Sequence, residues 1–354
     1  MTRVVVAMSG GVDSSVAAAL LKQQGHEVIG MMMRLWSEPG SEAANRCCAP
    51  DAIVMARRVA ARLEIPFYAV DAKHIFRDVV VQYFMDEYAQ GNTPNPCLAC
   101  NRYLRWGFLL QRALTLGANY LATGHYARVA GDGKGKFQLL RGVDPQKDQS
   151  YVLSVLTQEQ ISHSLFPVGE YTKPQVRQLA RDFGLPVAER EESQDLCFLG
   201  DEDYRDFLRR YVPAVEKPGP IVTRKGQHLG EHRGLAFYTI GQRKGLGISS
   251  SVPMYVLAKD TSENCLIVGR EDDLGGQELT ARNVNWVCGD PPVETIRVLV
   301  KIRYKAMDAW ASVSPLDGSR VHVRFDALLR DITPGQVVVF YEGDICLGGG
   351  IIEI

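Results

Sequence analysis

The chain has 354 residues, which is long for a single hydrophobic core, so we expect two or three domains. Its residues are 46% hydrophobic and 23% charged, with a net charge of −1, which excludes a wholly disordered chain and a globally basic nucleic-acid binder. Any contact with RNA must then come from local patches. The apolar run after Met1 is too short for a signal peptide, and no run reaches membrane-spanning length. We therefore expect a cytoplasmic protein without a membrane partner.

The N-terminal region alternates short β-branched runs with helical stretches as far as about residue 198, a pattern typical of a parallel sheet covered by helices. The expected strands are residues 4–8, 28–33, 67–70 and 120–123. The expected helices are residues 14–24, 51–63, 74–88, 101–116 and 171–183. These elements predict an α/β domain with a doubly wound parallel sheet over residues 1–212.

The composition changes at the proline-rich segment 213–220, which we interpret as a domain boundary. Beyond it, strand-like runs at 254–257 and 265–268 alternate with glycine-rich turns and predict a small central β-rich domain over residues 213–274. After Gly275 and Gly276, further runs at 298–303, 310–313, 321–325, 337–341 and 348–354 follow at even intervals. Short, evenly spaced strands are typical of a β-barrel, which we predict for residues 275–354.

The segment Ser9–Ser14 reads SGGVDS and lies directly between the first expected strand and the first expected helix. Its glycines let the backbone approach a ligand, and the N–H groups at a helix N-terminus bind phosphate oxygens. The chain lacks both the lysine of a Walker A loop and the G-x-G-x-x-G pattern. A lone pair of glycines would indicate only a tight turn, but six consecutive matches in this context indicate nucleotide binding.

The S-G-G-x-D-S pattern resembles that of the PP-loop ATPases, which split ATP into AMP and pyrophosphate. The resemblance implies adenylation, with Asp13 helping to hold Mg²⁺. The ATP contacts that it implies are Ala7, Met8, Ser9, Gly10, Gly11, Val12, Asp13, Ser14, Met33 and Gly124.

Two cysteine segments extend the resemblance. Cys97 and Cys100 lie in TPNPCLACN, which we expect to be a loop opening a helix, where the helix dipole would favour a thiolate. Cys197 lies far along the chain in QDLCFLG. Together with the phosphate loop, these segments resemble the N-P-x-x-x-C-N and C-F-[IL]-G motifs of the tRNA-specific 2-thiouridylases, over essentially the whole chain.

The resemblance implies an enzyme that adenylates the C2 oxygen of the wobble uridine U34 in tRNA and replaces it with sulfur. Cys197 would hold a persulfide received from a sulfur-relay protein or a cysteine desulfurase, and Cys100 would be its partner thiol, able to form a transient disulfide with it. The implied tRNA contacts are Asn95, Pro96, Cys97, His125, Lys147, Asp148, Gln149, Arg303, Tyr304 and Gln336.

One departure leaves an alternative open. Many members of the family have aspartate where this chain has Cys97, so Cys97, Cys100 and Cys197 could instead ligate an iron–sulfur cluster. The adjacent Cys47 and Cys48 are expected to have no role, or to handle sulfur. We expect the remaining cysteines to be packing residues: Cys265, Cys288 and Cys346.

Two other functions stay open from the residues alone. The chain could be a PP-loop synthetase that adenylates a small molecule, such as an argininosuccinate or GMP synthetase. It could also be a sulfur carrier or RNA-binding protein with a vestigial ATP site. ATP–pyrophosphate chemistry that depends on unmodified tRNA separates these possibilities from thiolation.

Overall fold

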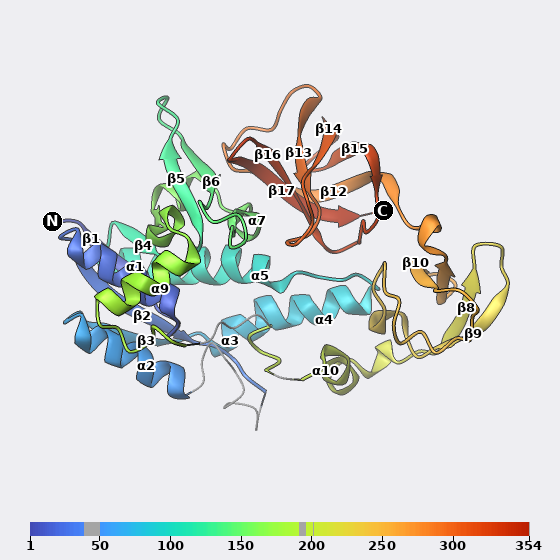
Figure 1. Ribbon diagram of the computed structural model, residues 1–354, viewed down its shortest axis with the longest axis horizontal. Helices are drawn as coiled ribbons and strands as arrows, with labels where there is room; N and C mark the ends of the chain where they lie inside the picture. The colour runs from blue at the N-terminus through green and yellow to red at the C-terminus, as the bar shows by residue number, and fades with distance from the viewer. Residues whose placement is uncertain (39–49, 191–195, 201, 354) are drawn as a thin grey trace.

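The structure, a computed structural model, describes residues 1–38, 50–190, 196–200 and 202–353. The N-terminal domain forms one end of an elongated molecule, the C-terminal barrel lies above its middle, and the central domain forms the other end (Figure 1). Cys47 and Cys48 lie outside the described residues. Within the described part, no helix is both long and apolar enough to span a bilayer.

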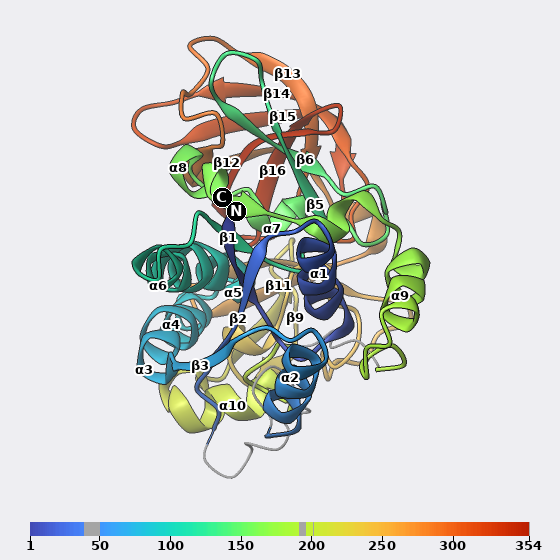
Figure 2. The ribbon, with the colours of Figure 1, turned by 90° about the vertical axis from the view of Figure 1, so that its left-hand side faces the viewer.

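The N-terminal domain is built on a five-stranded parallel sheet. Its strand order is β3 (Phe67–Asp71), β2 (Glu27–Arg34), β1 (Arg3–Ala7), β4 (Tyr120–Ala122) and β7 (Ser164–Leu165). Alternate residues of β1 enter different cores because successive side chains of a strand point to opposite faces. Val4 and Val6 pack on one face with α1 (Val12–Gln23), α2 (Pro50–Arg62) and α9 (Lys173–Asp182), whereas Val5 packs on the other face with α6 (Leu110–Thr115). Helices therefore cover both faces, which confirms the doubly wound sheet (Figure 2).

Two long helical stretches lie between β3 and β4, and both contain π-helix. The first runs through α3 (Lys73–Phe76), η1 (Arg77–Val81) and α4 (Gln82–Ala89). The second runs through α5 (Pro96–Ala99), η2 (Cys100–Leu109) and α6. The predicted helix start at residue 101 was too late, because Pro96 fits the first helical position and the Asn95 side chain accepts a hydrogen bond from the Cys97 N–H.

The central domain contains a four-stranded sheet in the order β10 (Tyr255–Asp260), β11 (Cys265–Gly269), β8 (Gly219–Thr223) and β9 (His228–His232). It follows α10 (Tyr204–Tyr211), whose Phe207 joins the same hydrophobic core as Val256 and Leu266 of this sheet. The β-rich character predicted for this region is confirmed, although the sequence patterns indicated only β10 and β11.

The C-terminal domain is a barrel formed by β12 (Gly276–Trp286), β13 (Ile296–Lys301), β14 (Ala309–Pro315), β15 (Val321–Leu329), β16 (Val337–Glu342) and β17 (Ile345–Glu353). Pairing of β12 with both β15 and β17 closes it. The hairpin β5 (Ala127–Gly131) and β6 (Phe137–Arg141) of the N-terminal region extends this sheet through β6 and β17. The barrel prediction is confirmed, and the hairpin, which the sequence analysis did not predict, joins the two domains.

Short helices complete the N-terminal region. They are α7 (Ser150–Leu153), α8 (Gln158–Ser162) and the 3₁₀ turn η3 (Pro167–Glu170). The helix α9 begins with a capping box in which Thr172 and Gln175 bond each other's backbone N–H groups. Because Lys173 is the first residue of α9, this cap fixes where its side chain leaves the helix.

Candidate active site

The phosphate loop follows β1 and is held in shape by its own hydrogen bonds. The Ser14 hydroxyl accepts from the Ser9 N–H at 3.2 Å and donates to the Gly11 carbonyl at 3.2 Å. Gly10 has φ of +73°, and a Cβ there would lie 2.5 Å from the Ala52 carbonyl oxygen. Only glycine fits this position, so the loop is preformed before any ligand binds.

Two of the residues predicted to contact ATP have their side chains in the core. Met8 and Val12 are each 3% exposed and pack among the apolar residues of α1 and the sheet. Only their main-chain atoms are left to reach a ligand. Met33, near the end of β2, is half-buried instead. It packs against two apolar clusters, one of which contains Cys100 and the other Trp106.

The carboxylate of Asp13 is engaged by two side chains that the sequence analysis did not single out. The Lys173 ammonium donates to both Asp13 oxygens, at 2.7 and 2.9 Å, and the Tyr126 hydroxyl donates to Oδ1 at 2.7 Å. Lys173 is buried, with only 9% of its side chain exposed. A buried lysine is retained where its charge is paired, so this ammonium forms a fixed positive charge beside the phosphate loop.

This arrangement bears on the magnesium ligand expected from the sequence. The two bonds from Lys173 and the bond from Tyr126 occupy three of the about four lone-pair sites of the Asp13 carboxylate, so these bonds leave a site on Oδ2 that a hard cation could use. A role of Asp13 as a magnesium ligand stays a prediction.

Gly124, two residues after β4, lies directly against the phosphate loop. A Cβ at Gly124 would come within 2.5 Å of the Ser14 nitrogen and 2.7 Å of the Asp13 carbonyl carbon. The absence of a side chain therefore lets β4 approach the start of α1 closely. The structure brings Gly124 together with Asp13 and Ser14, as a shared ATP site requires.

We expect Gly124→Ala to weaken ATP binding about tenfold, because the added methyl group must push the N-terminus of α1 and the loop aside. Isothermal titration with ATP measures the effect. Gly131→Ala is the matched control, since a Cβ at Gly131 meets no atom within 4 Å. Equal affinities of the two variants would contradict the close packing proposed for Gly124.

His125, predicted to face tRNA, is buried at 8% exposure next to Arg105 of η2. Arg105 Nη1 lies 3.1 Å from Nε2, and Thr123 Oγ1 lies 2.7 Å from Nδ1. A guanidinium can only donate, so Nε2 accepts and the proton resides on Nδ1, which donates to Thr123. Burial, reinforced by the Arg105 charge, holds the pKa of His125 well below its ordinary value. A role of His125 at the RNA surface stays a prediction.

The depressed pKa of His125 predicts a loss of stability in acid. The unfolded chain takes up a proton on this imidazole below about pH 6.5, whereas the folded protein resists doing so, so stability present above that value falls as the pH drops. Thermal melts from pH 7.5 to 5 should show that the melting temperature falls less for His125→Gln than for the wild type. The melting temperature of His228→Gln, a change at an exposed residue, should fall as much as that of the wild type. An equally large fall in His125→Gln would contradict the assignment of this acid sensitivity to His125.

The cysteines of the two motifs occupy distinct environments. Cys97 is exposed in the first turn of α5, and Cys100 is buried one turn later. Cys197 is half-buried and packs against the same apolar cluster that contains Cys100 and borders Met33. The residue after Cys197, Phe198, is anchored in that cluster, with its ring 5.2 Å from that of Phe84. The structure thus brings Met33, Cys100 and Cys197 to a common core.

The structure does not assemble a metal centre from the three cysteines. Within residues 1–38, 50–190, 196–200 and 202–353, no three or more His, Cys, Asp or Glu side chains are grouped so that they could hold a metal ion. The described residues therefore do not group Cys97, Cys100 and Cys197 as a ligand set, and an iron–sulfur cluster on them stays a prediction. Of the other cysteines, Cys346 is buried in β17 as expected. Cys288 is exposed and follows β12, so the prediction that it packs in a strand was wrong.

In the polar segment before α7, two of the three predicted tRNA contacts make hydrogen bonds within the protein. Asp148 is buried and accepts from the N–H groups of Gly142 and Ser150 and from the Ser150 hydroxyl. Gln149 accepts from the Tyr126 N–H through its side-chain oxygen. Lys147 is half-buried beside them. These hydrogen bonds hold the segment as a turn. Its contact with RNA stays a prediction.

Two predicted tRNA contacts of the barrel join the three domains. Gln336 donates to the Thr93 carbonyl at 2.7 Å, just before Asn95 and α5. Arg303 donates to the Ile240 carbonyl of the central domain at 3.3 Å and to the Thr333 hydroxyl. Gln336 therefore fixes the barrel on the segment that presents Cys97, and Arg303 fixes it on the central domain, whereas Tyr304 is 39% exposed.

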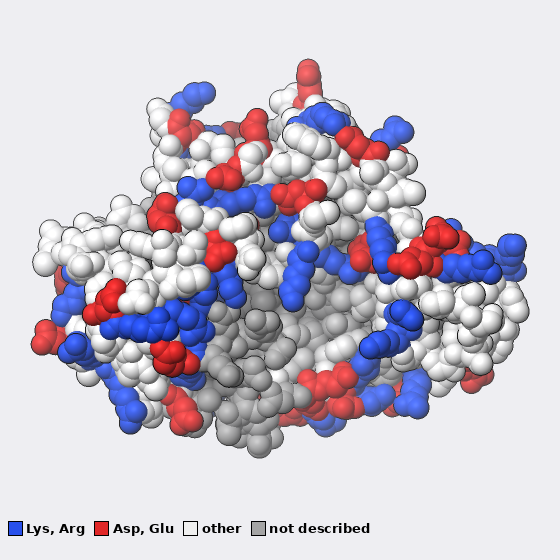
Figure 3. Space-filling model, in the orientation of Figure 1, with Lys and Arg blue, Asp and Glu red and all other residues white. Residues whose placement is uncertain are grey.

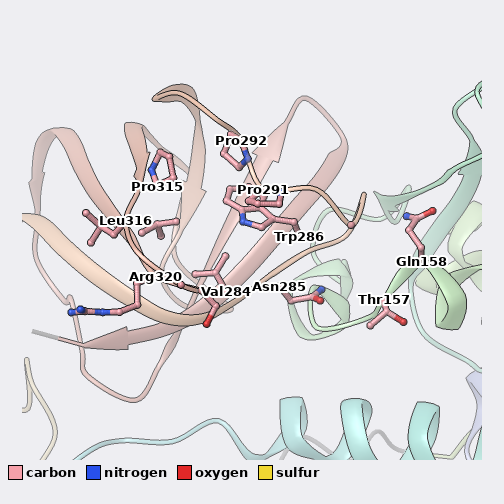
Figure 4. Close-up of a pocket in the computed structure, with 14 residues that line it drawn as sticks. Thr157, Gln158, Val284, Asn285, Trp286, Pro291, Pro292, Pro315, Leu316 and Arg320 are labelled. Atoms are coloured by element: carbon pink, nitrogen blue, oxygen red, sulfur yellow. The ribbon is translucent and has the colours of Figure 1, made fainter.

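Surface charge is distributed unevenly despite the near-neutral total. Lys and Arg side chains gather around the recess between the N-terminal domain and the barrel (Figure 3). A local basic surface of this kind attracts a phosphate backbone. A separate pocket of about 400 Å³ lies between the barrel and the start of α8, where Trp286, Pro291 and Gln158 line it (Figure 4). None of the predicted ATP or tRNA residues lines that pocket.

Comparison with known proteins gives matches along the chain. Residues 2–201 match the tRNA methyl transferase HUP domain, residues 205–270 the tRNA methyl transferase PRC-barrel domain, and residues 276–352 the aminomethyltransferase beta-barrel domain. A solved 4-thiouridine synthetase bound to RNA and ATP is a weak match, with 14% identity, a TM-score of 0.35, and coverage of 60% of this chain and 50% of its own.

Curated relatives match over their whole length. The tRNA-specific 2-thiouridylase MnmA 1 of Caldanaerobacter subterraneus is 51% identical over 99% of this chain and 98% of its own. The tRNA-specific 2-thiouridylase MnmA of Moorella thermoacetica is 49% identical over 99% of both chains. That of Pelotomaculum thermopropionicum is 49% identical over 99% of this chain and 97% of its own. With the three domain matches and the phosphate-loop geometry, these similarities establish that the chain belongs to the tRNA-specific 2-thiouridylase family of PP-loop ATPases.

Proposed function

We propose that the protein catalyses the ATP-dependent 2-thiolation of the wobble uridine, U34, of tRNA and is a tRNA-uridine 2-sulfurtransferase. Relatives of about half identical sequence carry the name 2-thiouridylase over the full chain. The observation that supports the proposal most strongly is the shared apolar cluster. Met33, at the edge where the phosphate loop lies, and Cys197 both pack against the apolar cluster that contains Cys100, which supports activation and sulfur transfer in one region of the molecule.

The first step activates a poor leaving group. The C2 oxygen of uridine attacks the α-phosphorus of ATP, an O–P bond forms, and pyrophosphate leaves. The N–H groups of the loop and the N-terminus of α1 would bind the phosphates. Lys173, held by Asp13, would place its positive charge beside them and stabilise the charge that develops on the departing pyrophosphate.

The second step replaces oxygen by sulfur. The terminal sulfur of a Cys197 persulfide attacks C2, and AMP leaves with the oxygen. The Cys100 thiolate then attacks the Cys197 sulfur and breaks the S–S bond, which releases 2-thiouridine and leaves a Cys100–Cys197 disulfide. The transferred sulfur is reduced while the two thiols are oxidised, and an external dithiol restores them. Cys100 lies in the apolar cluster that contains Phe84 and Cys197 packs against it, so both thiols belong to one region of the molecule.

Substrate and sulfur reach the site from two partners. We assign tRNA binding to the recess that faces the barrel domain. We place the N-terminal domain at residues 1–212, the central domain at residues 213–274 and the barrel domain at residues 275–354. Asn95, Pro96 and Cys97 would line the extruded base, because the C2 position cannot be reached in a stacked anticodon loop. The sulfur of Cys197 would come from a sulfur-relay protein or a cysteine desulfurase.

Protein purified anaerobically should contain no stoichiometric iron; bound iron required for activity would favour a cluster route.

Pyrophosphate release tests the proposal against a small-molecule synthetase. With ATP and Mg²⁺, we expect pyrophosphate only when unmodified tRNA carrying U34 is present. A tRNA transcript with cytidine at this position is the matched control and should give the background rate. Release that is independent of tRNA would contradict the proposed function.

A further inference from the structure

The barrel lies directly against the segment of chain that leads into α5 (Figure 1). The Thr93 N–H donates to the Pro334 carbonyl at 2.9 Å, and the Gln336 side chain donates to the Thr93 carbonyl at 2.7 Å. Gly335 between them has φ of +87°, and a Cβ there would lie 2.8 Å from the Cβ of Asn92. A glycine therefore lets the backbone of the barrel approach this segment closely.

One buried carboxylate joins the same segment to a second place on the barrel. Glu87, near the end of α4, has only 8% of its side chain exposed. Its Oε1 accepts from Arg282 of β12 at 2.8 Å, across 195 positions of sequence, and its Oε2 accepts from the Asn92 side chain at 2.8 Å. The Asn92 N–H also donates to the Glu87 carbonyl at 2.9 Å. Arg282 and Asn92 are thus linked through the two oxygens of a single side chain.

The charge of Glu87 makes its contact with Arg282 specific. A buried carboxylate is retained where a cation and hydrogen-bond donors compensate it. Arg282 supplies that cation from the barrel, and its guanidinium also lies 3.9 Å from the carboxylate of Glu353 in β17. An arginine donates several bonds in a fixed planar geometry, so it can face two carboxylates at once. The position of Asn92 therefore depends on where the barrel places β12.

The segment held in this way enters the part of the site that would receive the target base. Asn92 is followed closely by Asn95, the N-cap of α5, whose side chain accepts from the Cys97 N–H. The same helical stretch continues through Cys100 into η2. A displacement of about 1 Å at a reacting group can lower a rate on the order of a hundredfold. Fixing the entry of α5 therefore matters for the rate of the reaction.

We propose that Arg282 of the barrel is a positioning residue for thiolation, which acts through Glu87 and Asn92 to fix the segment that enters α5. The proposal rests on the proposed function. It gives the barrel a role besides tRNA binding, because the site that receives U34 is held in its active position by the contact of β12 with α4.

The test compares Arg282→Met and Glu87→Gln in a reaction with ATP, Mg²⁺, a persulfide source, a dithiol reductant and unmodified tRNA. For each variant we expect kcat for 2-thiouridine to fall about tenfold, less than the loss for a full displacement because the contacts of Thr93 remain. The KM for ATP should not change, since the phosphate loop is held by its own hydrogen bonds. The double variant should lose no more than either single variant, because both remove the same contact. Arg282→Lys keeps the charge and should recover part of the rate.

Arg297→Met is the matched control. Arg297 also lies in the barrel, on β13, and donates to both carboxylate oxygens of Asp326 on β15. This variant should keep the wild-type kcat. Thermal melts show whether each variant folds, and if Arg282→Met does not, Glu87→Gln and Arg282→Lys carry the test.

A wild-type kcat in folded Arg282→Met and Glu87→Gln would overturn the proposal. A lower rate for Arg282→Met alone, with weaker tRNA binding in a filter assay, would also overturn it, because Arg282 would then contact the phosphate backbone, which the acidic Glu87 cannot do. Losses that multiply in the double variant would show two separate roles and would overturn it as well. Absence of 2-thiouridine from the wild type would contradict the proposed function instead.

Discussion

Lys173→Met is expected to lower kcat/KM for ATP about a hundredfold, the usual loss when one preorganised donor to a developing anion is removed. Lys173 is buried and donates to both oxygens of Asp13, and no lysine of the Walker type is present in the loop to replace it. Steady-state pyrophosphate release at varied ATP measures the effect.

Two controls separate this role from folding. Lys22→Met removes another lysine of the region, at the other end of α1, where its partners are the Leu63 carbonyl and Glu64. This variant should retain wild-type kinetics. Asp13→Asn combined with Lys173→Met removes the uncompensated carboxylate, so the pair should restore thermal stability but not activity. A folded Lys173→Met protein with kcat/KM within twofold of the wild type would contradict the assignment.

Cys197→Ala is expected to abolish 2-thiouridine formation, a loss of at least about a thousandfold, because no other group can present the activated sulfur to C2. Pyrophosphate release should persist, since the phosphate loop is built without Cys197. Cys100→Ser should form no 2-thiouridine without added thiol, because no thiolate of the protein then breaks the S–S bond that holds the product on Cys197. Quantification of 2-thiouridine and pyrophosphate from the same samples measures both.

Cys288→Ala is the matched control for this prediction. Cys288 is exposed and lies at the barrel, remote in sequence from both motifs, and its thiol contacts the Asp290 carbonyl. It should behave as the wild type. Thiolation by Cys197→Ala at the wild-type rate would contradict the proposed persulfide on Cys197. It would not contradict the proposed adenylation step.

Much of the N-terminal domain follows from local patterns. Runs of β-branched residues at Val4–Val6 mark a buried strand, and the glycines and Asp13 that follow mark its phosphate-binding end. The carboxyl edge of a parallel sheet is where ligands bind, so Met33 and Gly124 could be placed near the loop from strand ends alone. The helix start at Pro96 was also present in the sequence as a cap followed by proline, although the pattern was interpreted as a loop.

The remaining features depend on contacts between distant parts of the chain. Lys173 meets Asp13 across 160 positions, and no local pattern distinguishes it from a solvated lysine in a first helical turn. The hairpin β5–β6 is recognised only when β17 pairs with it. His125 follows β4 at the ligand edge, yet its burial against Trp106 and beside Arg105 arises from packing of η2 on the sheet. Tertiary packing decides such cases, and sequence spacing does not report it.

The most direct test of the central claim is to incubate the protein with ATP, Mg²⁺, a persulfide source, a dithiol reductant and unmodified tRNA, and then to digest the tRNA for mass spectrometry. We predict 2-thiouridine at U34, dependent on ATP and lost in Cys197→Ala. Unmodified uridine at U34 with the wild-type protein, under both aerobic and anaerobic conditions, would contradict the account.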